Sequence, residues 1–146
     1  MEPEIRWLMK KYKWLPTPKL VIIPFNTRYY MQDYGVYYYP GLYYSAFEPN
    51  RYGTILVNER FIDLIDYMNT IAHEFRHHWQ YYMNWKFGDD PFDNALSHYE
   101  GLIKFYCGSL SEFDALKFSL KMAPTDDSYN VYNACLKHFN KNGYPK

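Results

Sequence analysis

The sequence has few cysteines and no long hydrophobic run, and each shortage excludes a class of protein. Cys107 and Cys135 are the only cysteines among 146 residues, too few for the disulfide framework of a small secreted domain. The longest aliphatic run is Leu20 to Ile23, far short of the roughly 20 apolar residues in a membrane-spanning helix. We therefore predict a soluble protein in a reducing compartment, with both cysteines buried as small hydrophobic side chains.

The chain also lacks an excess of charge of either sign. Its 16 basic and 16 acidic side chains give a formal net charge of zero, so it has no basic excess with which to bind nucleic acid or an anionic membrane. Residues 1–14 lack the apolar region of a secretory signal peptide. We expect a cytoplasmic protein without a nucleic-acid or membrane partner, and these features indicate no particular oligomeric state.

Tyrosine, by contrast, is abundant. The chain has 18 Tyr, and nine of them fall between Tyr29 and Tyr52. Two interpretations compete: AT-rich codons, as in a viral or mobile-element genome, and an aromatic binding surface. The first is favoured because Tyr is also frequent outside this segment.

The order of the expected elements indicates an α+β fold in a single domain, 1–146. Strand-like segments cluster in the first half, and amphipathic helical patterns follow them. A small mixed or antiparallel sheet should therefore precede a long helix and a helical C-terminal half. The helix over 61–82 is long enough for a break near Asp66–Asn69, and Asp126 or Asp127 is the expected N-cap of the last helix. We expect helices over 4–14, 61–82, 93–106, 109–121 and 128–140, and strands over 19–25, 35–39, 43–47 and 54–58.

A metal-binding motif lies within the long expected helix. It reads His73-Glu74-Phe75-Arg76-His77, and histidines four positions apart lie one turn apart on the same helix face. Both imidazoles can therefore reach one Zn²⁺ ion. Glu74 lies about 100° further round the helix, where it can reach a water at the metal and act as general base.

The spacing of residues alone leaves the third metal ligand open. A catalytic zinc usually takes three protein ligands, and the segment Tyr81–Asn84 offers no further histidine. The same ligand types would also accept Mn²⁺, Fe²⁺ or Co²⁺. Four downstream side chains are candidates for the third ligand: His98, Glu100, Glu112 and Asp114.

Two segments resemble zinc metallopeptidases of the gluzincin type. Thr70-Ile-Ala-His-Glu-Phe-Arg-His-His-Trp-Gln80 is similar to their active-site helix, and Glu112-Phe-Asp-Ala-Leu-Lys-Phe-Ser119 to the helix that supplies their third ligand. The resemblance is to the HtpX and ImmA/IrrE peptidases, and it implies a zincin-like fold with Glu112 as the third zinc ligand. Glu100 stays the rival ligand, and His98 would take this place in an SprT-like protease.

The sequence departs from the gluzincin pattern four residues after Glu112. Many members of the family place an acid there that supports a ligand histidine, whereas this chain has Leu116. Support must then come from another group, such as Asp114 or a backbone carbonyl. Ala115 and Ser119 are small enough to let the two helices approach closely.

The resulting hypothesis is a zinc endopeptidase that acts on a peptide or protein substrate. His73, His77 and Glu112 would hold Zn²⁺, Glu74 would be the general base, and His98 or a Tyr would stabilise the oxyanion. Residues 54–58 would form an edge strand that pairs with the substrate. The alternatives are a non-catalytic protein that uses zinc to staple two helices, and an SprT-like protease that acts on DNA-bound proteins, which the neutral charge disfavours.

Overall fold

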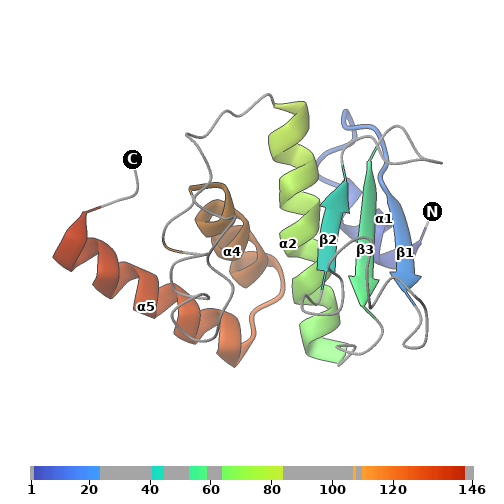
Figure 1. Ribbon diagram of the computed structural model, residues 1–146. Coiled ribbons are helices and arrows are strands. Elements are labelled where there is room, and N and C mark those ends of the chain that lie inside the picture. Colours follow the sequence, from blue (N-terminus) through green and yellow to red (C-terminus); the bar gives the residue numbers. More distant parts are fainter. Residues whose placement is uncertain are drawn as a thin grey trace.

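The computed structural model describes residues 2–23, 41–44, 53–58, 64–83, 107 and 110–143. The expected strand over 35–39 and helix over 93–106, together with His98 and Glu100, lie outside these residues. None of the described helices is both long and apolar enough to cross a membrane. Figure 1 shows the described elements: α1 (Pro3–Met9), β1 (Lys19–Ile23), β2 (Gly41–Tyr44), β3 (Thr54–Asn58), α2 (Leu64–Tyr82), α4 (Leu110–Met122) and α5 (Asp126–Asn142).

The three described strands form one mixed sheet, which confirms the α+β class. The strand order is β1-β3-β2, with β1 parallel to β3 and β2 antiparallel to it. Thr54 of β3 is paired with Lys19 of β1 on one side and with Tyr44 of β2 on the other. The expectation of an edge strand over 54–58 is therefore wrong, because β3 pairs on both sides. Its buried, β-branched and aliphatic residues fit this central place.

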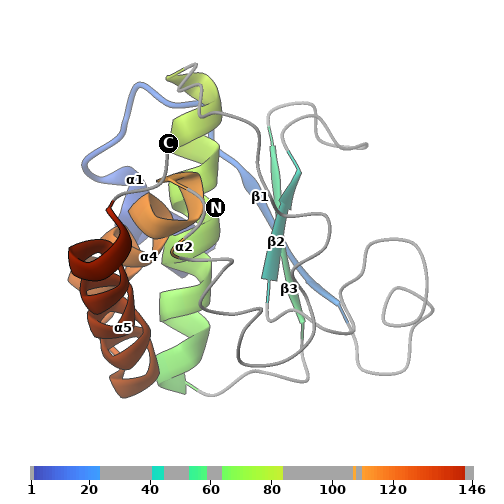
Figure 2. The same ribbon diagram turned by 60° about the vertical axis from the view of Figure 1, so that its left-hand side comes forward.

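Helix α2 separates the sheet from the C-terminal helices. In Figure 2 the sheet is seen nearly edge-on, with α2 between it and the α4–α5 pair, and all described helices lie on the same side. Ile71, Ala72 and Phe75 of α2 are fully buried in a core shared with Ile55 of β3 and Phe118 of α4. Within its bounds α2 is continuous, so the break expected near residues 66–69 is absent. Helix α2 thus packs against the sheet on one side and against α4 on another.

A hydrogen-bonded turn fixes α5 against the start of α2. The expected N-cap, Asp126 or Asp127, is wrong: Thr125 caps α5, and its side chain accepts a hydrogen bond from the backbone N–H of Ser128. Asn69 of α2 donates its side-chain amide to the carbonyl of Ala123 at 2.9 Å and accepts from the Ser128 hydroxyl at 2.9 Å. These bonds hold the segment between α4 and α5 against Asn69, which lies one turn of α2 before His73.

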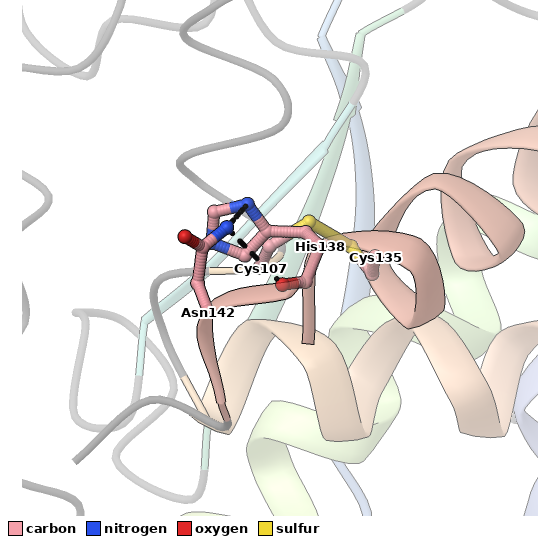
Figure 3. Close-up of a disulfide and its surroundings, with 4 residues drawn as sticks. All are labelled: Cys107, Cys135, His138 and Asn142. Atoms are coloured by element: carbon pink, nitrogen blue, oxygen red, sulfur yellow. Dashed lines mark hydrogen bonds between the residues drawn. A yellow bond between two sulfur atoms is a disulfide. The ribbon is translucent and has the colours of Figure 1, made fainter. Parts of the chain in front are cut away.

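Cys107 and Cys135 form a disulfide, contrary to the expectation that they are free thiols. Both residues are buried, as expected, in a small cluster with Leu116 and Phe139. Figure 3 shows the bond beside α5, where the Asn142 amide donates to the His138 carbonyl. The sequence did not predict this disulfide, because pairing depends on where the fold places the two cysteines. Two cysteines without a spacing motif do not reveal that placement. The prediction of a reducing compartment thereby loses its basis.

Removing this disulfide should lower the free energy of unfolding by about 3–4 kcal/mol, because the bond closes a 28-residue separation. The variant is Cys107→Ser/Cys135→Ser, compared with wild type by urea unfolding. Adding a reductant should lower the wild-type midpoint to that of the double variant and leave the variant unchanged. Two reactive thiols per chain in unreduced, denatured wild type would contradict the bond.

Candidate metal centre

The two motif histidines and Glu112 meet between α2 and α4. His73 and His77 lie one turn apart on α2, with their ring centroids 5.0 Å apart. The Nε2 of His73 lies 2.9 Å from Oε2 of Glu112, and the Nε2 of His77 lies 2.9 Å from Oε1. Glu112 is in the first turn of α4, which packs against α2 (Figure 1). The structure thus brings together all three residues expected to be zinc ligands.

Close packing of the helices makes this meeting possible. Ala115 and Ser119 follow Glu112 along α4, and both are fully buried. The Ser119 hydroxyl donates to the carbonyl of Leu116 within the helix, so it makes no demand on a partner in α2. Small side chains at this spacing let helix axes approach closely.

His73, His77 and Glu112 form a partly buried ion pair between two imidazoles and one carboxylate. Burial opposes the ionised form of Glu112, but attraction to His77 and hydrogen bonds from both imidazoles outweigh it and hold the pKa of Glu112 well below its usual range. Burial likewise lowers the pKa of His77, yet Glu112 and Glu74 outweigh this and raise it to about 10. The ionised carboxylate accepts an Nε2–H from each imidazole. A metal that binds here would replace these protons.

Glu74 is buried beside the histidines. One nitrogen or oxygen atom each of His73, Glu74 and His77 lie within 4.8 Å of one another, close enough for one metal ion to reach all three. Burial raises the pKa of the Glu74 carboxyl, against the attraction of His73 and His77. A carboxyl with a raised pKa beside a metal site suits proton transfer near neutral pH.

Gln80, to which we assigned no role from the sequence, contacts the Nδ1 of His77. The acid that many gluzincins use to support a ligand histidine is replaced here by Leu116, whose side chain cannot accept a hydrogen bond. The Nδ1 of His77 lies 2.8 Å from Oε1 of Gln80, one turn further along α2. Gln80 in turn donates to Oδ2 of Asp114 at 2.9 Å. Asp114 is therefore linked to His77 through Gln80. The signal available beforehand was a glutamine three residues after the second histidine, which is too common to single out.

Arg76 and His78 have partners outside the cluster formed by His73, His77 and Glu112. Arg76 pairs with Asp114 through Nε at 2.7 Å, and its guanidinium lies 3.6 Å from the centroid of the Trp79 ring. The fully buried His78 donates from Nε2 to the carbonyl of Pro16 at 2.6 Å. Burial lowers the pKa of His78 to about 4, against that hydrogen bond. His78 therefore ties the segment after α1 to α2 and stays outside the cluster.

The donor set fits a zinc ion. Two imidazole nitrogens and one carboxylate are the ligands that catalytic zinc takes in several hydrolases, and here the same carboxylate contacts both nitrogens. The rival third ligands, His98 and Glu100, lie outside the described residues, whereas Glu112 lies in contact with both histidines.

In comparisons with protein-family models, curated proteins and solved structures, nothing matches this chain.

Proposed function

We propose that the chain is a zinc-dependent endopeptidase, with His73, His77 and Glu112 as metal ligands and Glu74 as general base. The observation that carries this proposal is the meeting of Glu112 with both Nε2 atoms at 2.9 Å. A helix face that carried His and Glu only for solubility would have no need for an acid from another helix in contact with both histidines. The gluzincin resemblance of the two helices supports the same assignment.

The residues divide the catalytic work by position. A bound zinc ion would lower the pKa of a water molecule to about 7 and polarise the scissile carbonyl. Glu74 would accept the proton of the attacking water and then deliver it to the leaving amine. Its buried place, with a raised pKa, matches a group that must both take and return a proton. The oxyanion partner, His98 or a Tyr, stays part of the proposal.

The position of the sheet supports a revised substrate strand. Because β3 is central, it cannot pair with a substrate as first expected. The described sheet has two edge strands, β1 and β2, and of these β2 is antiparallel to β3 and packs closely against α2. We assign an extended peptide substrate to this strand, where backbone hydrogen bonds would hold it.

The rival function is a zinc staple between α2 and α4 without catalysis. The cluster does join these helices, which is the observation that favours it. Such a site would be closed by a fourth protein ligand instead of water. A raised pKa at buried Glu74 supports the enzyme over the staple, because a staple gives that carboxyl no task. A cytoplasmic location stays a prediction, and the disulfide weighs against it.

The proposal predicts one zinc per chain and metal-dependent cleavage of peptides. Elemental analysis of protein purified without chelators would measure the metal, and digestion of an unstructured protein or a peptide library would measure cleavage. Adding a chelator should stop cleavage, and zinc should restore it. Purified protein that neither contains nor takes up a divalent metal would refute the proposal.

A further inference from the structure

We infer that Gln80 is a positioning residue, which fixes the tautomer of His77 so that Nε2 is the atom offered to the metal. The inference rests on the proposed metal site, but it concerns a side chain outside the ligand set. Gln80 lies on α2 and is buried. Its side-chain amide lies between His77 and α4. The amide oxygen contacts a ring nitrogen of His77, and the amide nitrogen contacts oxygen atoms of α4.

The orientation of the Gln80 amide is determined by its neighbours. Its Nε2 lies 2.9 Å from the carbonyl oxygen of Ser111 and 2.9 Å from Oδ2 of Asp114. Both neighbours are acceptors, the second an ionised carboxylate paired with Arg76. An amide has two N–H donors on one end and an acceptor oxygen on the other. The nitrogen must therefore face α4, and the oxygen must face His77.

The oxygen of Gln80 then dictates the protonation of His77. Oε1 lies 2.8 Å from Nδ1 and can only accept, so Nδ1 must carry the hydrogen. In a neutral imidazole one nitrogen is protonated and the other bears the lone pair. When the ring gives up the Nε2 hydrogen that Glu112 accepts at 2.9 Å in the metal-free protein, the lone pair is therefore left on Nε2. Without Gln80, the neutral ring would be free to place the proton on Nε2 and so block the metal.

Asp114, one of the two acceptors of the Gln80 amide, is itself held by two hydrogen bonds from Arg76. Asp114 accepts from Arg76 Nε at 2.7 Å and from Arg76 Nη2 at 3.3 Å. Ser111 and Asp114 flank the ligand Glu112 in the sequence, so the amide that orients His77 is bonded to the same turn of α4 that supplies Glu112. One turn of α4 therefore sets the place of one ligand and the tautomer of another.

The test is the zinc affinity of Gln80→Leu, which keeps the bulk of the side chain and removes both ends of the amide. Competition with a chelator of known affinity should show zinc binding weakened by about 10–100-fold, the usual effect of removing a group that orients a ligand histidine. Tyr81→Leu is the matched control, because it introduces the same residue at the next, exposed position of α2. Its zinc affinity should stay within about twofold of wild type.

The wild-type protein offers a second measurement that does not depend on the folding of a variant. Long-range ¹H–¹⁵N spectra of the zinc-loaded protein should show His77 with the hydrogen on Nδ1 and the metal on Nε2. Zinc on Nδ1, or a folded Gln80→Leu that binds zinc as tightly as wild type, would overturn the role of Gln80 and leave the metal site standing. Wild type that binds no zinc would instead refute the proposed function.

Discussion

Glu74→Gln should leave zinc bound and lower the rate of peptide hydrolysis by about 10²–10⁴-fold, the contribution expected of a general base. The substitution keeps the size of the side chain and removes only its ability to accept a proton. The buried carboxyl has a raised pKa because of its burial, so the neutral amide should be tolerated there without loss of stability. Initial rates at saturating zinc, measured beside zinc content, give the comparison.

This variant also separates the enzyme from the zinc staple. If zinc only joins α2 to α4, Glu74→Gln should have the same zinc content, the same stability and the same absence of cleavage as wild type. Asp127→Asn, at an exposed position of α5, is the matched control for an acid-to-amide change. Full peptidase activity in Glu74→Gln would remove Glu74 from the mechanism.

Glu112→Ala should weaken zinc binding by more than the roughly 10–100-fold expected for a group that only orients a ligand. It removes a ligand outright and leaves the imidazoles of His73 and His77 with their ring centroids 5.0 Å apart. The pair of hydrogen bonds between α2 and α4 is lost with it, so the metal-free protein should also unfold more readily. Chelator competition measures the first effect and thermal unfolding the second.

Glu100→Ala is the discriminating companion of this variant, because the sequence leaves Glu100 as a rival ligand. Zinc should be lost in Glu112→Ala and His77→Ala and kept in Glu100→Ala. Zinc kept in Glu112→Ala and lost in Glu100→Ala would move the third ligand to residue 100 and remove the gluzincin assignment. Asp126→Ala, an exposed acid on α5, controls for the general loss of a negative charge.

The local elements of the fold could be predicted where periodicity and chain breakers agree. The strand over Thr54–Asn58 has the predicted bounds, and the helix that carries Glu112 was expected over 109–121 and is Leu110–Met122. The place of a strand within the sheet is a different matter. It depends on which segments pair with it, so β3 could not be recognised as central from its own residues. The hydrogen bond between Asn69 and Ser128 could not be predicted for the same reason, because the two residues are far apart in the sequence.

The candidate site could be predicted only as far as helix geometry reaches. Two histidines four residues apart must share a face, and the third partner came from a family resemblance. The hydrogen bonds of Gln80 could not be foreseen, since its partners Ser111 and Asp114 are more than thirty residues away. The disulfide was missed because the low cysteine count indicated free thiols, and no local pattern joins Cys107 to Cys135.

That disulfide has a consequence for how the molecule would survive a cut in its backbone. It closes a covalent ring that includes all of α4 and the first part of α5, with the α4–α5 turn and its exposed Pro124 at the far side. A protease that nicked this turn would leave both fragments joined, and the fragment with α5 could not diffuse away from the fragment that holds α2 and α4. The nicked chain would run as one band in a denaturing gel until a reductant separated it into two.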